Sequence, residues 1–298
     1  MDFSGIYPAL TTPFAADGSV SVADLKHNIE RYNRTGIAGY AVTGSTGESV
    51  LLSHAEWERV LIAVKESAAS NKRLIAGAGM ESTAETIQRT KIAGELGYHA
   101  ALVKTPHYYK PVYKPDLLIT HYRRVADASP IPVLLYSVPQ FTGITMEAPE
   151  VAVLAQHSNI VGIKESSGHV QRVAEMVAAT PPDFQVLTGG GGVVLPSLVV
   201  GAKGAILAAA SALPDQYAEL YDLTRSGQLD KARELQLALL HISKAFGADT
   251  GIAGIKFVMD QRGYRGGLPR PPLLPISDSL KQRLTQLLAT LEPVAARA

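Results

Sequence analysis

Short apolar runs alternate with amphipathic stretches through most of the chain. Each run is bounded by Gly, Pro, Asn or Ser and is too short for a helix, which is typical of a strand buried on both faces. The predicted strands lie at residues 5–10, 39–43, 73–76, 100–104, 133–137, 160–165, 185–188 and 205–208. Helix-length stretches separate them, and several of these open on a serine cap such as Ser53 or Ser82. The pattern therefore predicts an α/β protein.

Strands that alternate with helical crossovers form a parallel sheet, and eight of them close into a (β/α)8 TIM barrel. The structural alternative is a doubly wound open sheet, but no G-x-G-x-x-G motif follows any predicted strand. After Leu213 the patterns are helical, at residues 214–226, 229–246, 252–262 and 277–291. We therefore expect a barrel over residues 1–213 and a C-terminal helical extension over 214–298 that packs on the barrel as one structural unit.

The sixth predicted strand carries a lysine at the point where it leaves the core. Ile160, Val161 and Ile163 are apolar, and Lys164 and Glu165 follow them. Because an ammonium is costly to bury without a partner, a lysine placed here can become a neutral amine nucleophile that forms a Schiff base with a carbonyl substrate. The simpler interpretation is a strand-end lysine whose head reaches water, and taken alone the residue favours that interpretation.

The ends of the other strands supply further candidates, because a barrel of this kind carries its active site there. Residues 44–48 read Gly-Ser-Thr-Gly-Glu, whose N–H and hydroxyl groups suit a carboxylate, although an ordinary turn is the commoner explanation. Tyr136 ends the fifth strand and could relay protons to a substrate hydroxyl, or could simply pack at the rim. Lys104, at the end of the fourth strand, is the rival nucleophile. Lys164 is favoured because the small Ser-Ser-Gly after it leaves room for a ligand.

Composition and charge exclude several classes of protein. The 298 residues contain no cysteine and carry a net charge of +1, so disulfides, thiolate chemistry, Cys-ligated zinc and a basic nucleic-acid surface are not expected. The eight histidines lack metal-site spacing, and the glycine run 189–192 lacks the Gly-Lys-Ser/Thr of a nucleotide loop. That run could cradle a phosphate or let the backbone approach a substrate. With no secretory signal or membrane-length apolar run in view, we expect a cytoplasmic protein that does not act on membranes.

Taken together, these positions resemble the dihydrodipicolinate synthase / N-acetylneuraminate lyase family of pyruvate-handling class I aldolases. The matching motifs, in order, are Gly-Ser-Thr-Gly-Glu at 44–48, Thr-Pro at 105–106, Tyr136 with Val-Pro at 138–139, and Gly-Ile-Lys-Glu at 162–165. The resemblance covers nearly the whole chain. It implies a Schiff base between Lys164 and a 2-oxo acid, a proton relay at Tyr136, and a carboxylate site at Ser45 and Thr46, with Gly47 beside them.

Further site residues, and an assembly, follow from the same resemblance. Tyr108 matches the family tyrosine that reaches into a neighbouring subunit's site, and family members are commonly tetramers, so a homodimer or homotetramer is expected. Ile206 matches a position whose backbone carbonyl faces the site. From their positions in the chain, Ser166 and Ser167, just past the lysine, are candidates for binding the distal carboxylate of the substrate, although simple loop capping explains them equally well. Gly189, in the glycine run after the seventh strand, is a further substrate-binding candidate. Beyond the covalent bond on Lys164, no cofactor and no metal are expected.

Substrate choice is expected to depend on the segment after Tyr136. In the dihydrodipicolinate synthases of the family that this chain resembles, an arginine at this place binds the carboxylate of aspartate semialdehyde. The matching residue in this chain is Phe141. An uncharged ring would lose about 1.5–3 kcal/mol of charge-assisted bonding to that carboxylate. Other segments resemble the 4-hydroxy-2-oxoglutarate aldolase branch, at residues 5–8, 136–139, 183–187 and 263–267. That branch tends to have Asn where Thr46 stands and lacks an equivalent of Phe141.

The sequence therefore favours a lyase that cleaves 4-hydroxy-2-oxoglutarate, or a related 4-hydroxy-2-oxo acid, to pyruvate and an aldehyde such as glyoxylate. Three alternatives stay open. The first is 4-hydroxy-tetrahydrodipicolinate synthase activity, and the second is a sugar-acid lyase or dehydratase that uses the same Schiff base. The third is a binding protein that kept the fold and lost turnover, against which the presence of both Lys164 and Tyr136 argues.

Overall fold

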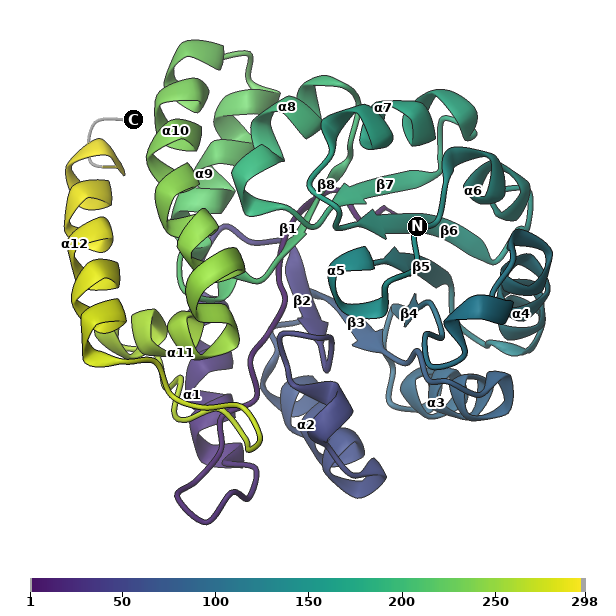
Figure 1. Ribbon diagram of the computed structural model, residues 1–298, viewed down its shortest axis with the longest axis horizontal. Helices are drawn as coiled ribbons and strands as arrows, with labels where there is room; N and C mark the ends of the chain where they lie inside the picture. Colours follow the sequence, from purple (N-terminus) through teal and green to yellow (C-terminus); the bar gives the residue numbers. More distant parts are fainter. Residues whose placement is uncertain (1, 296–298) are drawn as a thin grey trace.

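The computed structural model describes residues 2–295 as a parallel β-barrel surrounded by helices (Figure 1). Its strands are β1 (Gly5–Pro8), β2 (Gly39–Val42), β3 (Arg73–Gly77), β4 (Ala100–Lys104), β5 (Val133–Ser137), β6 (Ile160–Glu165), β7 (Gln185–Thr188) and β8 (Gly204–Leu207). Each strand pairs in parallel with its neighbours in the order β1-β8-β7-β6-β5-β4-β3-β2. A parallel bridge between Ala9 and Ala41 joins β1 to β2. The predicted TIM barrel is confirmed, and the open sheet is wrong.

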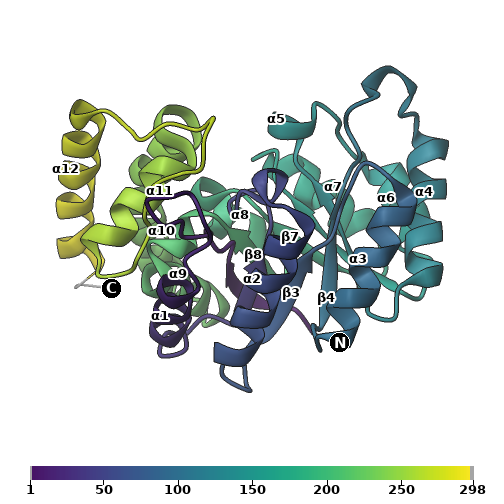
Figure 2. The ribbon, with the colours of Figure 1, turned by 90° about the horizontal axis from the view of Figure 1, so that it is seen from below.

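A helix follows every strand, and further helices complete the C-terminal part. They are α1 (Val22–Tyr32), α2 (His54–Ser67), α3 (Thr83–Glu95), α4 (Pro115–Ala128), α5 (Pro139–Thr142), α6 (Ala148–Leu154), α7 (Val170–Ala179), α8 (Val194–Val199), α9 (Pro214–Arg225), α10 (Leu229–Ala245), α11 (Gly251–Gln261) and α12 (Asp278–Ala295). The predicted caps hold, because the hydroxyls of Ser53 and Ser82 accept N–H groups of the first turns of α2 and α3. Figure 2 shows the N-terminus and α5 at opposite ends of the barrel.

Two short elements depart from the predicted boundaries. Residues 138–145 follow the predicted fifth strand and show no helical pattern, but Pro139 opens the single turn α5, and Gly143, at φ 65°, ends it. A π-helical turn, Phe246–Thr250, joins α10 to α11, where a simple break was expected. Both turns are shorter than the window over which a hydrophobic period can be recognised.

Alternate residues of each central strand face different cores. On β4, Ala100 and Leu102 belong to the cluster inside the barrel, whereas Ala101 and Val103 pack against the surrounding helices. Leu134 and Tyr136 of β5 also belong to the interior cluster. This two-residue period fixes which residues enter the barrel mouth at the strand ends.

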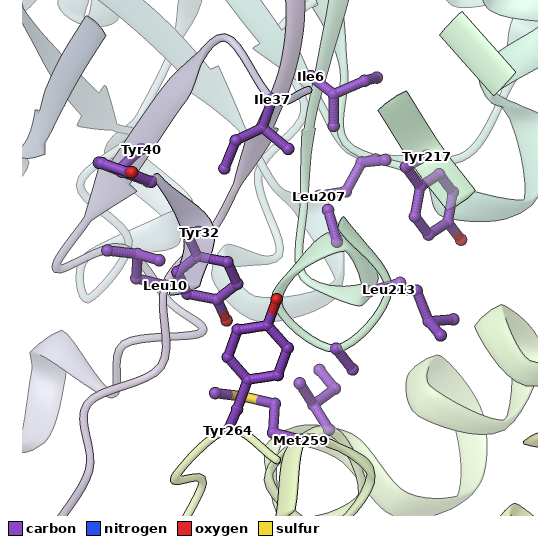
Figure 3. Packing of buried hydrophobic residues seen from close by; sticks show 14 of the residues in the cluster. Ile6, Leu10, Tyr32, Ile37, Tyr40, Leu207, Leu213, Tyr217, Met259 and Tyr264 are labelled. Carbon is purple, nitrogen blue, oxygen red and sulfur yellow. The ribbon is translucent and has the colours of Figure 1, made fainter. Parts of the chain in front are cut away.

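The C-terminal helices share a core with the first part of the barrel. Tyr264 stacks on Tyr32 with ring centroids 4.6 Å apart, and Met259 lies beside them (Figure 3). Leu239 of α10 and Leu284 of α12 belong to the same buried cluster. The last three residues of the expected extension, 296–298, lie outside the described part of the chain. Within residues 2–295, no helix combines the length and apolarity needed to cross a bilayer.

Candidate active site

Tyr136 and Lys164 lie side by side at the carboxyl ends of β5 and β6. The two residues occupy matching positions in the parallel register, and both follow the interior face of their strands. The Lys164 Nζ lies 4.3 Å from the centroid of the Tyr136 ring. Tyr136 is 5% exposed and Lys164 6% exposed, so neither head extends into bulk water. The simple interpretation of Lys164 as a solvated strand-end lysine is therefore wrong.

Gly189 brings the backbone after β7 against this lysine. A Cβ at Gly189 would lie 1.8 Å from the Ser166 Oγ and 3.1 Å from the Lys164 Cε, so only glycine fits without displacement of both side chains. The N–H of Gly189 donates to the carbonyl of Glu165. The Ser166 hydroxyl is buried and finds no hydrogen-bond partner within residues 2–295. A close approach of backbone to the site thus explains this first glycine of the run, and Ser166 is not a loop cap.

The side chain of Glu165 is buried beside the site on the outer face of β6. Burial raises the pKa of its carboxyl group, against the hydrogen bond that its Oε1 accepts from the N–H of Ser167 at 2.9 Å. Its Oε2 has no hydrogen-bond partner in the described part of the chain. The sequence assigned no role to Glu165, whose carboxylate ties the end of β6 to the Ser167 N–H just beyond it.

The loop at residues 44–48 lies between two strained backbone positions. Thr43 and Glu48 adopt φ angles of 54° and 55°, in the left-handed region that residues with a Cβ rarely occupy. Strain of this kind persists only where surrounding contacts hold it, and it clusters at ligand sites. One such contact is the Thr12 hydroxyl, which donates to the Gly47 carbonyl at 2.7 Å. Contacts with the surrounding chain therefore fix the conformation of this loop, which is not an ordinary turn.

A buried ion pair ties this loop to the C-terminal helices. The Lys256 Nζ lies 2.6 Å from the Glu48 Oε1, and both side chains are fully buried. The same ammonium donates to the carbonyls of Thr12 and Leu268 at 2.8 and 2.9 Å, and the second carboxylate oxygen of Glu48 accepts the N–H of Arg270 at 2.8 Å. The extension thus fixes the conformation of the loop after β2.

A cavity of about 270 Å³ opens between the loop after β2 and the end of β5. Its wall includes Thr43, Ser45, Glu81, Lys104, Tyr108 and Tyr136. Three of the predicted site residues therefore meet at one hollow, namely Ser45, Tyr108 and Tyr136. Tyr108 is 76% exposed and packs edge-on against Tyr109 at the outer rim.

The other predicted site residues do not line this hollow, and Lys164, Gly189 and Ser166 are among them. Thr46 is buried in the loop next to Ser45, and Ile206 belongs to the interior cluster that includes Tyr136. Phe141 lies on α5 and is 63% exposed. Its ring is thus open to solvent at the rim of the barrel rather than buried in the mouth.

Lys104 and its partners form the part of the site that the sequence did not assign. The Lys104 Nζ lies 3.7 Å from the Glu81 Oε1 and 3.5 Å from the His107 Nδ1. Burial lowers the pKa of the Lys104 ammonium, and the Glu81 carboxylate opposes that shift. Lys104 was considered only as a rival nucleophile, and Glu81 and His107 were missed. Strand register could have pointed to Lys104, because this residue ends β4 and pairs with Tyr136 on β5.

Metal binding finds no support in the described part of the chain. Among residues 2–295, no three His, Asp or Glu side chains converge closely enough to hold a metal ion.

Comparison with known proteins places this arrangement in one family. The model of the dihydrodipicolinate synthetase family matches residues 2–291. The chain is 36% identical over 287 residues to the 4-hydroxy-tetrahydrodipicolinate synthase of Methanothrix thermoacetophila, covering 96% of each chain. It superimposes on the structure of the synthase from Methylacidiphilum fumariolicum SolV with a TM-score of 0.94 at 30% identity, covering 99% of this chain and 98% of the other.

A third similar protein is the dihydrodipicolinate synthase of Acinetobacter baumannii, whose structure is a complex with pyruvate. The two chains superimpose with a TM-score of 0.93 at 28% identity, covering 98% of this chain and 99% of the other. Enzymes of this family are lyases that act through a pyruvate Schiff base on a lysine and need no external cofactor. The relatives compared here bear the synthase name, so the 4-hydroxy-2-oxoglutarate aldolase branch stays a prediction. The chain belongs to the dihydrodipicolinate synthetase family of lysine Schiff-base enzymes.

Proposed function

We propose that this protein is a pyruvate-handling class I aldolase in which Lys164 is the nucleophile. The observation that carries the proposal is the buried contact between the Lys164 ammonium and the Tyr136 ring at the barrel mouth. A lysine held there is screened from bulk water and lies next to a phenol that can exchange protons. Gly189 lets the backbone after β7 pack closely against the lysine side chain, which fixes the position of the amine.

The reaction follows from these positions. The Lys164 amine attacks the C2 carbonyl of a 2-oxo acid, and loss of water gives an iminium. In the cleavage direction Tyr136 takes the proton of the C4 hydroxyl, the C3–C4 bond breaks, and the aldehyde leaves while the bonding electrons form an enamine. Protonation of the enamine at C3 and addition of water then release pyruvate and restore the amine. In the condensation direction the enamine of pyruvate attacks an aldehyde, and Tyr136 returns the proton.

Binding of the 2-oxo acid's own carboxylate is assigned to the loop after β2. Ser45 faces the cavity, and Thr46 follows it in the strained segment between Thr43 and Glu48. Because this conformation is held before a ligand arrives, its N–H and hydroxyl donors need little ordering on binding. The unpaired Ser166 hydroxyl, close to Lys164, is a further donor for the substrate.

Two acceptors fit this chemistry. The names of the relatives favour condensation with aspartate semialdehyde, which is 4-hydroxy-tetrahydrodipicolinate synthase activity. Phe141 weighs against that reaction, because its exposed ring offers no charge to the carboxylate of aspartate semialdehyde, and the second candidate is cleavage of 4-hydroxy-2-oxoglutarate to pyruvate and glyoxylate. Both reactions share the Schiff base on Lys164.

One preparation of the protein, assayed in two ways, separates these acceptors. Pyruvate release from 4-hydroxy-2-oxoglutarate is followed with lactate dehydrogenase, and condensation of pyruvate with aspartate semialdehyde is followed with a coupled reductase. Cleavage at least tenfold faster in kcat/KM than condensation supports the aldolase assignment, and the reverse ratio supports the synthase. Activity in neither assay, with Lys164 intact, would overturn the proposed function.

The proposed assembly is a cytoplasmic homo-oligomer, a dimer or tetramer, in which Tyr108 approaches the site of a neighbouring subunit. Its exposed ring, with Tyr109 packed against it, supports this contact, because large exposed aromatic side chains at a rim are typical interface anchors. Replacement of Tyr108 by alanine tests the contact through the oligomeric state and kcat together.

A further inference from the structure

Lys104 is a second lysine at the barrel mouth, and the proposed mechanism does not use it. It pairs in register with Tyr136, which pairs in turn with Lys164, so the three side chains form a row across β4, β5 and β6. Ala100 and Leu102 on the same strand face the barrel interior, and Lys104 continues that face. Adjacent strands are about 4.8 Å apart, which places the backbones of the two lysines about 10 Å apart on either side of Tyr136.

The Lys104 ammonium is held in the cavity wall with weak partners. Its Nζ contacts to Glu81 and His107, at 3.7 and 3.5 Å, are longer than the 2.7–2.9 Å of a strong charge-assisted hydrogen bond. An ammonium has three donors, and a largely buried one that lacks close acceptors gains from an anionic ligand. Lys104 is therefore suited to bind an anionic oxygen of a ligand.

The Glu81 carboxylate bonds mainly to the loop after β4, which leaves the Lys104 ammonium able to bind a ligand. Its Oε2 accepts the N–H groups of His107 and Tyr108, each at 2.9 Å, and its Oε1 lies 2.6 Å from the His107 Nδ1. The carboxylate thus holds the loop after β4 in place. Glu81 lies beside the ammonium at 3.7 Å, but its shorter contacts are all to the loop.

Resting on the proposed function, we propose that Lys104 is the specificity-determining cation that binds the second, distal carboxylate of a five-carbon 2-oxo dicarboxylate held on Lys164. The loop at 44–48 takes the first carboxylate, and Tyr136 stands beside the reacting carbons between the two lysines. Phe141 supplies no charge at the rim, so the cation comes from β4 instead of from α5. The enzyme thereby selects dianionic substrates without an arginine at Phe141.

The test uses borohydride trapping, which reports Schiff-base formation without any turnover. 2-Oxoglutarate carries the distal carboxylate, and 2-oxopentanoate has the same chain length with a methyl group in its place. The half-saturating concentration of each acid, and of pyruvate, is measured in a fixed short exposure for the unaltered protein, Lys104→Met and Lys104→Arg. Circular dichroism confirms that each variant is folded, and each acid is tested in a separate reaction.

We expect the unaltered protein to be half-saturated by 2-oxoglutarate at a lower concentration than by 2-oxopentanoate. Lys104→Met should raise the value for 2-oxoglutarate about 10- to 100-fold, the range that corresponds to one lost charged hydrogen bond. It should leave 2-oxopentanoate and pyruvate within about twofold, and Lys104→Arg should restore most of the preference because it keeps the charge. An equal loss for all three acids would overturn the proposal in favour of a role in loop support or first-carboxylate binding, and so would no loss for any.

The same experiment distinguishes failure of the Lys104 assignment from failure of the proposed Schiff-base function. If the unaltered protein traps no 2-oxo acid at all, the Schiff-base function fails and the assignment of Lys104 falls with it. If pyruvate is trapped on Lys164 but the preference for 2-oxoglutarate is absent or survives Lys104→Met, the Schiff-base function stands and the assignment of Lys104 alone is wrong.

Discussion

The Lys164 ammonium lies 4.3 Å from the centre of the Tyr136 ring, and the two residues occupy the same level of adjacent parallel strands. Two chain segments that are separated by α5 and α6 thus deliver a nucleophile and a proton carrier to one point. The rigid register of β5 and β6 fixes that relationship, since a shift of one residue would turn one side chain out of the barrel.

Replacement of Tyr136 by phenylalanine should separate proton transfer from Schiff-base formation. The ring that packs on Lys164 remains, but the phenol is lost, so kcat should fall by a factor of about 10²–10⁴. Trapping of pyruvate on Lys164 by borohydride should persist, although more slowly. Steady-state kinetics and mass spectrometry measure the two effects on one sample, and an unchanged kcat would exclude Tyr136 as the proton relay.

Gly189→Ala should disturb the site by steric clash alone. The added methyl group would meet the Ser166 Oγ at 1.8 Å and the Lys164 Cε at 3.1 Å, so both side chains must move. A displacement of this kind is expected to reduce kcat about 10²-fold or more, because catalysis depends on near-attack geometry. Gly247→Ala is the matched control, as nothing lies within 4 Å of a Cβ at that position. Equal activity of the two variants would show that Gly189 does not shape the site.

Loss of one partner of the buried Glu48–Lys256 ion pair should lower the stability of the protein, and substitution of both partners should recover part of that loss. Lys256→Met leaves the Glu48 carboxylate without its cation in a fully buried position, which should destabilise the protein by about 3–5 kcal/mol. Glu48→Gln in the same chain removes the unpaired charge and should recover a large part of the loss. Urea unfolding of the two single variants and the double variant gives the three free energies of unfolding, and strict additivity would contradict a direct pairing.

Acid should destabilise the protein through Glu56. Hydrogen bonds from the Arg270 guanidinium lower the pKa of Glu56 from 4.5 to about 2. A depressed folded-state pKa means that this carboxylate contributes stability above about pH 4.5 and loses that contribution as the pH falls toward 2. Urea midpoints measured between pH 5 and pH 2.5 should therefore fall less steeply for Glu56→Gln than for the unaltered protein. Parallel slopes for the two proteins would remove Glu56 from the acid response.

Much of the fold was predictable from sequence because it depends on local pattern. The apolar runs gave the strands, and for β4, β5 and β7 the predicted bounds are those observed. The order of strands then followed from the parallel crossovers, and it brought Tyr136 next to Lys164. The position of α5 was not predictable, because one turn that starts at a proline leaves no periodic signal.

The contacts that set the details of the site are those between distant segments. Glu81 reaches the loop after β4, and Lys256 reaches Glu48 from the far end of the chain. No spacing in the sequence marks either contact, since each depends on how loops pack once the barrel has closed. The strained angle at Thr43 is of the same kind, because a threonine gives no hint of a left-handed backbone.

The most direct test of the account is borohydride reduction of the protein in the presence of pyruvate, followed by peptide mass mapping. We expect one adduct, on the peptide that contains Lys164, and its absence from a Lys164→Arg variant. Lys104 is the internal control, because it is the other lysine at the barrel mouth and its ammonium is also largely buried. An adduct on the Lys104 peptide, or no adduct on any peptide, would contradict the assignment of Lys164 as the nucleophile.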